Sequence, residues 1–253
     1  MTGATTAAVQ WRLATVVAIR EETKTVKTIR FDVPGWPGHL GGQHVDLRLT
    51  AEDGYVAQRS YSIASGAGVH PVIELTVDAI PDGEVSGFLH DELRVGDQIE
   101  IRGPIGGYFA WSAAHDYGLL LIAGGSGIVP LMSMLRSRTS AGATKPARLL
   151  YSSRGVEQII YRSELDRLAS QSNNFTLTHT LTRTVPPAWD SERGRIDREM
   201  LTRRQFFPAG NPDVYVCGPT TFVEEIAEQL VGLGHTESRI RTERFGPTGE
   251  TRL

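Results

Sequence analysis

The chain has 253 residues, including 26 Lys or Arg, 29 Asp or Glu and one Cys, and its formal net charge is −3. Charged residues make up 22% and hydrophobic residues 40%, a composition typical of soluble globular proteins that excludes a disordered or fibrous chain. The slightly negative charge argues against nucleic acid as the main partner, and the lone cysteine excludes an intramolecular disulfide, a cysteine-ligated iron–sulfur cluster and a Cys-rich zinc site.

The sequence gives no sign of a membrane or an export signal. No apolar run approaches the roughly 18 residues that a membrane-spanning helix needs. The N-terminus MTGATTAAVQWRLA lacks the basic start and the apolar stretch of a secretory signal. We therefore expect a cytoplasmic protein with no membrane partner.

Residues 11–110 are predicted to form mainly short strands. In the segments 43–49 and 72–80, apolar and polar side chains alternate with the period of two that is typical of half-buried strands. Further strands are expected near 13–19, 26–33 and 98–102, separated by turns rich in Gly and Pro. This pattern indicates an antiparallel sandwich or barrel. One short helix is predicted from Ser86 to about Leu93, with Ser86 as its N-cap.

After about residue 113 the pattern changes to apolar runs that alternate with helical segments. The predicted strands are 119–123, 147–153, 175–182, 213–220 and 239–243, and the predicted helices are 128–138, 155–170 and 221–234. Such alternation implies βαβ units and a parallel sheet covered on both faces. Thr221 and Glu224 fit a capping box at the start of the last helix. We therefore expect two domains, 1–112 and 113–253.

Two motifs in the second half lie where strands end. Gly124–Pro130 reads GGSGIVP between a strand and a helix, where glycines allow a diphosphate to approach the backbone and the helix N-terminus favours its charge. Alone, such a turn is just as often an ordinary tight turn. Cys217–Thr220 reads CGPT and would open onto the same sheet edge. Read alone, Cys217 is more often a small buried apolar residue.

A third motif, QRSYSIAS at Gln58–Ser65, lies in the strand-rich half. Arg59 offers a guanidinium that pairs well with phosphate, and Tyr61, on the same face of a strand, offers a flat ring. Read alone, Tyr61 is more often a cross-strand packing aromatic. The segment PDGEVS follows about twenty residues later and could supply backbone N–H groups to the same phosphate.

Together these motifs resemble the ferredoxin–NADP reductase superfamily, the flavin reductases that include cytochrome b5 reductase and the reductase components of bacterial oxygenases. The matching segments, in order, are RSYS at 59–62, GEVS at 83–86, GGSGIVP at 124–130, CGPT at 217–220 and ERFG at 243–246. The resemblance covers about residues 11–246. It implies a six-stranded antiparallel Greek-key FAD-binding barrel followed by an α/β domain with a five-stranded parallel sheet that binds NAD(P).

The resemblance also implies roles for individual residues. Arg59 would hold the flavin diphosphate, Tyr61 would pack on the isoalloxazine ring, and Ser62 would lie near flavin N5. Cys217 and Glu243 would lie beside the nicotinamide, so that Ser62, Cys217 and Glu243 are the expected catalytic residues. The other expected flavin-binding residues are Ser60, Val77, Gly83, Val85 and Ser86. The other expected nucleotide-binding residues are Gly124, Gly125, Gly127, Pro130, Gly218, Pro219 and Phe245.

The preference between NADPH and NADH depends on the ends of the second and third parallel strands. Side chains placed there to hold a 2′-phosphate are Ser152, Arg154, Thr182, Arg183 and Arg195, and we favour NADPH slightly on that basis. No acidic residue stands directly at the end of the second strand to bind a 2′-OH, although Glu157 is nearby. FAD is favoured over FMN because RSYSIAS resembles the FAD-type members.

The resemblance implies hydride transfer from NAD(P)H to FAD, followed by release of single electrons. Because one cysteine cannot ligate an iron–sulfur cluster, the expected acceptor is a separate protein such as a ferredoxin. Two alternatives remain open: an NAD(P)H-dependent reductase of a small molecule such as free flavin, a quinone or a metal chelate, and a non-catalytic flavin-binding subunit.

Overall fold

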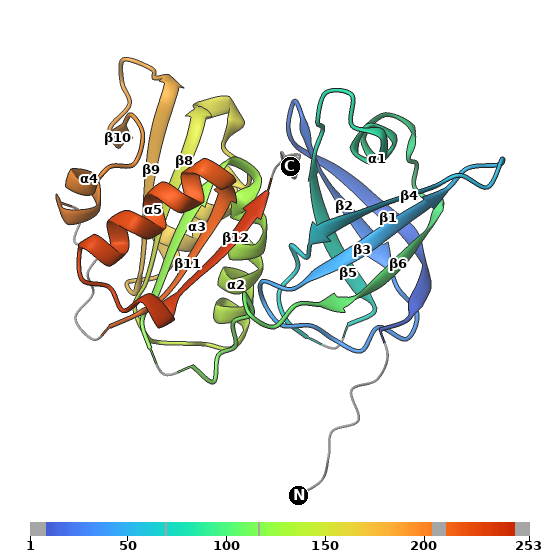
Figure 1. Ribbon diagram of the computed structural model, residues 1–253, viewed down its shortest axis with the longest axis horizontal. Helices are drawn as coiled ribbons and strands as arrows, with labels where there is room; N and C mark the ends of the chain where they lie inside the picture. The colour runs from blue at the N-terminus through green and yellow to red at the C-terminus, as the bar shows by residue number, and fades with distance from the viewer. Residues whose placement is uncertain (1–8, 69, 116, 204–210, 246–253) are drawn as a thin grey trace, which may run out of the picture.

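The computed structural model describes residues 9–68, 70–115, 117–203 and 211–245, and these form a β-barrel beside a sheet covered by helices (Figure 1). No helix within these ranges combines the length and apolar character needed to cross a membrane. Within the same ranges, no group of three or more His, Cys, Asp or Glu side chains is arranged to hold a metal ion.

The first half of the chain is the expected six-stranded antiparallel barrel. Its strands are β1 (Trp11–Thr23), β2 (Val26–Asp32), β3 (His44–Thr50), β4 (Val56–Ser62), β5 (Val72–Asp78) and β6 (Gln98–Ile105). They pair in the order β4-β3-β6-β1-β2-β5, and a bridge between Ile63 and Leu75 joins the two ends of the sheet. The barrel therefore places the RSYS motif on β4, next to the point of closure.

The barrel core follows from the alternation seen in the sequence. Val45 and Leu47 on β3 are fully buried, as are Ile73 and Leu75 on β5. Asp46 departs from the pattern because it is also buried, at 6% exposure, where it accepts a hydrogen bond from Ser60 and pairs with Arg102. The apolar positions thus fix which face of each strand points inward, while a paired charge occupies one position predicted to be exposed.

The predicted helix in the barrel half begins earlier than expected. The structure has a short helix α1 (Glu84–Gly87) that continues into a π-helical turn η1 (Phe88–Glu92), and the N-cap is Gly83. Ser86 lies inside α1, where its hydroxyl donates to the Gly83 carbonyl and accepts the Ile80 N–H. The prediction of Ser86 as N-cap was therefore wrong, because this hydroxyl closes the preceding turn instead.

The second half contains a parallel sheet of six strands rather than five. Its strands are β7 (Leu119–Gly124), β8 (Ala147–Gly155), β9 (Phe175–Thr184), β10 (Glu192–Arg193), β11 (Asp213–Pro219) and β12 (Ile240–Phe245), in the order β10-β9-β8-β7-β11-β12. The additional strand β10 has only two residues, too few for a periodic pattern. The predicted α/β class is confirmed.

Helices cover both faces of this sheet. They are α2 (Ile128–Ser140), α3 (Arg162–Gln171), α4 (Arg198–Arg203) and α5 (Thr220–Gly232), with single 3-10 turns η2 (Gly125–Gly127), η3 (Val156–Gln158) and η4 (Glu237–Arg239). Side chains of α2 and α3 pack with Leu121 and Leu149 in one core, and side chains of α4 and α5 pack with Leu120 and Leu150 in another. Side chains of consecutive residues in these buried strands therefore pack into cores on opposite faces of the sheet.

Two details of the predicted helices were wrong. The segment 155–170 is not one helix, because Tyr161 adopts φ 58° and separates η3 from α3. The last helix has no capping box: β11 runs directly into α5 at Pro219, no side chain caps the helix, and Thr221 already lies within it. In both places tertiary packing overrides the local signal.

Candidate functional site

The two glycine-containing motifs of the parallel sheet lie against each other. Strands β7 and β11 are neighbours, with Ala123 opposite Cys217. The 3-10 turn that follows β7 brings Gly127 so close that a Cβ atom at this position would overlap the Cys217 carbonyl oxygen. Only glycine fits there, so the turn is specified by this approach of two backbones.

The ring of Phe222 packs against glycines of both motifs. A Cβ atom at Gly124 would lie 3.1 Å from the ring of Phe222, and one at Gly218 would lie 2.8 Å from the same ring. Phe222 is on the first turn of α5. Phe222 could not be recognised from the sequence as part of the site, because the helical pattern already explains it as a packing side chain.

The outer side of the turn is open. Gly125 has φ +55°, and a Cβ atom built on it would meet no heavy atom within 4 Å. The turn leads directly into α2, where Gly127 occupies the N-cap position. The first N–H groups of a helix of 13 residues therefore stand beside an open glycine surface, an arrangement suited to a diphosphate.

Cys217 and Glu243 are paired across neighbouring strands at the same sheet edge. The Cys217 side chain is fully buried, and burial together with the Glu243 charge raises the pKa of its thiol. A thiol held protonated in this way is a poor nucleophile. Cys217 therefore offers bulk and a weak S–H donor rather than covalent chemistry.

Glu243 is half-buried, and burial is the only cause that shifts its pKa. Its Oε2 atom is buried and has no hydrogen-bond partner among the described residues. Burial raises the pKa of Glu243 from its ordinary value of 4.5 to about 7. Near neutral pH this group therefore exists partly as a neutral acid that is able to donate a proton or a hydrogen bond.

The barrel presents a second set of available groups on β4. The exposed Arg59 donates to the Gln58 carbonyl at 2.7 Å and forms no ion pair within the described part of the chain. Tyr61 is half-buried against the barrel core, and burial raises the pKa of its hydroxyl to about 12. The Ser62 hydroxyl is buried and has no partner in the described ranges. A cation, an aromatic face and an unsatisfied hydroxyl thus follow one another along four residues.

Other residues predicted to bind flavin are already engaged. The Ser60 hydroxyl donates to Asp46 at 2.7 Å, and the side chains of Val77 and Val85 are only 1% exposed in the barrel core. A Cβ atom at Gly83 would overlap the Ser86 hydroxyl, so this position requires glycine. These residues have no free side chain to offer a ligand.

The residues predicted to hold a 2′-phosphate lie along the ends of β8, β9 and β10. Ser152 pairs in register with Gly124 on one side and with Thr180 on the other. Thr182 donates to the Ser153 carbonyl at 3.3 Å. The side chains of Arg154, Arg183 and Arg195 are exposed. The strand register therefore brings this set to the same sheet edge as the glycine turn.

Acidic groups also lie near this edge. Burial raises the pKa of Asp78 on β5 of the barrel, and the Arg154 charge opposes that rise, so Arg154 lies close enough to Asp78 to interact with it. A Cβ atom at Gly155 would lie 2.9 Å from Oε1 of Glu157. The Glu157 carboxylate therefore folds back over the end of β8, a position that the sequence had left without an acidic residue.

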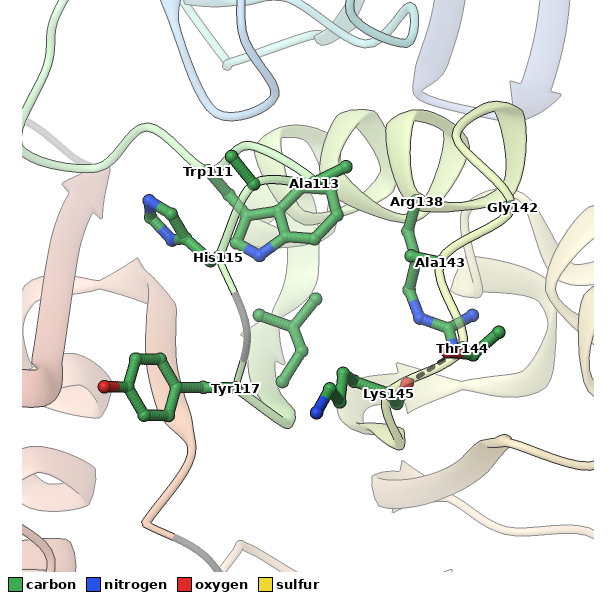
Figure 2. A pocket seen from close by; sticks show the side chains of 11 residues that line it. Trp111, Ala113, His115, Tyr117, Arg138, Gly142, Ala143, Thr144 and Lys145 are labelled. Carbon is green, nitrogen blue, oxygen red and sulfur yellow. Dashed lines mark hydrogen bonds between the residues drawn. The ribbon is translucent and has the colours of Figure 1, made fainter.

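A separate cavity of about 200 Å³ lies at the other end of the parallel sheet (Figure 2). It is bordered by the start of β7 at Leu119, the buried Trp111 and the end of α2 at Arg138. None of the predicted site residues lines it. This cavity therefore plays no part in the arrangement described above.

Comparison with known proteins agrees with both halves of the chain. Residues 13–110 match the oxidoreductase FAD-binding domain and residues 121–228 match the oxidoreductase NAD-binding domain. The chain is 33% identical to ferredoxin–NADP reductase B of Sorangium cellulosum, over 92% of this chain and 96% of that protein. It is 34% identical to the glycine betaine monooxygenase reductase subunit of Pseudomonas aeruginosa, over 93% of this chain but only 64% of that protein's length.

Solved structures share the whole fold. The FAD/NAD-binding domain of nitric oxide dioxygenase from Vibrio cholerae has a TM-score of 0.83 with 22% identity and covers 93% of this chain and 99% of that one. A ferredoxin–NADP+ reductase from Neisseria gonorrhoeae has a TM-score of 0.78 with 20% identity, over 92% and 98% of the two chains. At these identities the structures support the fold rather than a particular activity.

The raised pKa of Glu243 predicts a pH-dependent stability. In the unfolded chain this carboxyl titrates near 4.5, and in the folded protein near 7. Between these values the folded state binds more protons, so the free energy of unfolding should fall as pH rises from about 5 to 7 through this group. Glu243→Gln should lose this component, which denaturant unfolding of both proteins at pH 5, 6, 7 and 8 would measure. The exposed Glu225→Gln is the control, and a pH-independent difference between Glu243→Gln and the parent would contradict the assignment.

Proposed function

The chain belongs to the ferredoxin–NADP reductase superfamily, and on that premise we propose that it transfers a hydride from NAD(P)H to FAD and passes the electrons to a separate redox partner. One observation carries the proposal. Among the described residues, the barrel strand β4 offers a cation without an ion pair and a hydroxyl without a partner. The facing domain offers a glycine turn packed against the strand that carries Cys217, which pairs with Glu243. These are the parts that two bound dinucleotides require. The division into domains 1–112 and 113–253 and a cytoplasmic location belong to the same proposal.

The residues of β4 fit the flavin. Arg59 is a cation with no ion pair in the described part of the chain, and it would hold the diphosphate. Tyr61 would pack its face on the ring system. The buried Ser62 hydroxyl, which lacks a partner among the described residues, would find one in a ring nitrogen near the reacting position. Gly83, Val85 and Ser86 would contribute backbone N–H groups only.

The residues of the parallel sheet fit the nicotinamide nucleotide. The open turn at Gly125 and the start of α2 would hold its diphosphate. Cys217 and Glu243 would line the nicotinamide, and Phe245, opposite Pro219 on the neighbouring strand, would close that side. When bound, FAD accepts two electrons with the hydride and releases them singly. The protein's part is to orient the rings and exclude water, and the partly neutral Glu243 supplies a buried donor.

Similarity to reductase subunits supports a protein acceptor. The chain spans 64% of the length of the glycine betaine monooxygenase reductase subunit and 62% of the propane 2-monooxygenase reductase component of Rhodococcus jostii. It spans 96% of the Sorangium ferredoxin–NADP reductase. We therefore assign a ferredoxin or a similar one-electron carrier as the partner.

The function is tested by reconstitution and anaerobic reduction. We expect the purified protein to bind FAD, and we expect the visible absorbance of the oxidised flavin to bleach on mixing with NADPH or NADH. Added ferredoxin should then reoxidise the flavin. Flavin that stays oxidised with both nucleotides would instead support a binding subunit. Reoxidation by a quinone or free flavin, and not by ferredoxin, would support the small-molecule reductase.

The Arg59 assignment predicts a loss of flavin. Arg59→Ala removes a charge-assisted bond to the diphosphate that is worth about 1.5–3 kcal/mol, so the dissociation constant for FAD should rise at least tenfold. Arg12→Ala is the matched control, because Arg12 lies on β1 and donates to the carbonyls of Gln10 and Gly103. Titration of each apoprotein with FAD measures the dissociation constants of the two variants and of the parent. Equal FAD affinity in the Arg59 variant and the parent would show that the diphosphate lies elsewhere.

The exposed arginines at the ends of β8 and β9 predict a preference for NADPH over NADH. We propose that Arg154 and Arg183 bind a 2′-phosphate, so replacing both with Ala should raise the KM for NADPH about tenfold or more and leave that for NADH within about twofold. Steady-state kinetics with each coenzyme would measure this. If the KM values rise together, or if NADH is the better substrate of the parent, Glu157 rather than the arginines would determine the preference.

A further inference from the structure

Helix α2 joins the nucleotide turn to the flavin strand. It begins at Ile128, directly after the glycine turn, and runs beside the barrel (Figure 1). Its middle and second half contact residues 64–67, which follow the RSYS strand closely. The fully buried Ser133 donates to the Ser65 carbonyl at 2.6 Å, and the Ser137 hydroxyl accepts the Ala67 N–H at 2.7 Å. A Cβ atom at Gly66 would lie 3.2 Å from Arg136, so the two segments are in close contact.

Arg136 extends this contact into a network of ion pairs. Its guanidinium donates to the Ala64 carbonyl at 2.8 Å and to Glu74 on β5 at 2.9 Å, and it grips Glu164 on α3 through two nitrogens at 3.0 and 2.7 Å. The side chain is only 16% exposed. Burial opposes its charge, but the Glu164 carboxylate and its other partners raise the pKa of Arg136. One side chain thus bonds the barrel and the helices of the other domain together.

Tyr161 forms a second connection to the same barrel strand. It is 3% exposed and adopts φ 58°, a conformation that a bulky residue keeps only where its surroundings enforce it. Its hydroxyl forms a short hydrogen bond to Thr76 on β5, Thr76 bonds to Thr28 on β2 at 2.7 Å, and the Arg136 guanidinium lies 5.1 Å from the centre of the tyrosine ring. The strained residue therefore aims its hydroxyl into the wall of the barrel.

Both connections are directional. Hydrophobic contact between two domains is non-directional and leaves the angle between them loosely defined, whereas buried hydrogen bonds of fixed length define one orientation. The Arg136 connection also links the two expected sites along the chain, since Ala64 follows RSYS by two residues and Arg136 is on the helix that begins at the glycine turn. A small change in either bond would move one site relative to the other.

We propose that Arg136 and Tyr161 are positioning residues that hold the nicotinamide site in register with the flavin site, and so set the distance over which the hydride moves. This inference rests on the proposed function. Hydride transfer needs the reacting atoms about 3–3.5 Å apart, and a displacement of about 1 Å is enough to lower the rate by about two orders of magnitude. The bonds described for both side chains go to protein groups, so their effect would pass through domain orientation.

The kinetic experiment uses flavin-loaded protein with the variants Arg136→Gln, Tyr161→Phe and Thr76→Val. Each should keep its flavin and bind nucleotide within about twofold of the parent, while the rate constant for flavin reduction in anaerobic stopped flow falls about tenfold or more. Thr76→Ser, which keeps the hydroxyl, should restore the parent rate. Arg203→Gln is the control, because its ion pairs with Glu192 and Glu199 lie on β10 and α4, far from the barrel (Figure 1).

A second readout does not depend on the reaction. Spin labels on Val17→Cys in β1 and Val231→Cys in α5, both exposed positions, report the distance between the domains, and the buried Cys217 is shielded from the label. The distance distribution should be narrow in the parent and distinctly broader in Arg136→Gln and Tyr161→Phe. An unchanged distribution in both variants, or parent-like reduction rates in all three, would overturn the proposal. If neither coenzyme reduces the parent, the proposed function fails, and the label distances alone decide the positioning role.

Discussion

The site depends on one close approach of backbone to backbone, between the turn after β7 and the end of β11. Gly127 lies against the Cys217 carbonyl with no room for a Cβ atom. This contact places the N-terminus of α2 beside the Cys217–Glu243 pair, so the expected diphosphate and nicotinamide positions share one edge. Because α2 also carries Ser133 and Arg136, the same contact fixes where the helix meets the barrel.

Ser62 Oγ and Glu243 Oε2 are among several buried side-chain atoms without a hydrogen-bond partner in the described part of the chain, and they come from different domains. A buried polar group without a hydrogen bond costs about 1–3 kcal/mol, so folding alone gives no reason to keep either. The buried hydroxyls of Ser133 and Ser137 each form a hydrogen bond, whereas that of Ser153 has no partner within the described ranges. On the proposed function, the flavin would satisfy Ser62 Oγ and the nicotinamide nucleotide would satisfy Glu243 Oε2, one in each domain.

Much of the fold and part of the site could be predicted from sequence. Alternation in β3 and β5 and the apolar run of β7 gave the barrel and the parallel sheet, because long periodic segments carry a strong signal. The two-residue β10 and the break at Tyr161 could not be predicted, since the first is too short for a period and the second is imposed by a bond to Thr76. Phe222 could not be recognised as a support of the glycine turns, and Glu157 could be named only as a nearby acid, because both placements depend on contacts made across turns.

The bonds between the domains also give a reason for the buried charge of Arg136 at their interface. Replacing a buried ion pair with apolar side chains is often neutral or stabilising, so Arg136 with Glu74 and Glu164 is weak evidence for stability. The same bonds are good evidence for a defined geometry, since each has a preferred length and direction. The proposed hydride transfer between two separately bound rings would need that geometry more than extra stability. The left-handed backbone conformation of Tyr161 also favours a role in defining geometry, because it directs the tyrosine hydroxyl to Thr76 of the barrel.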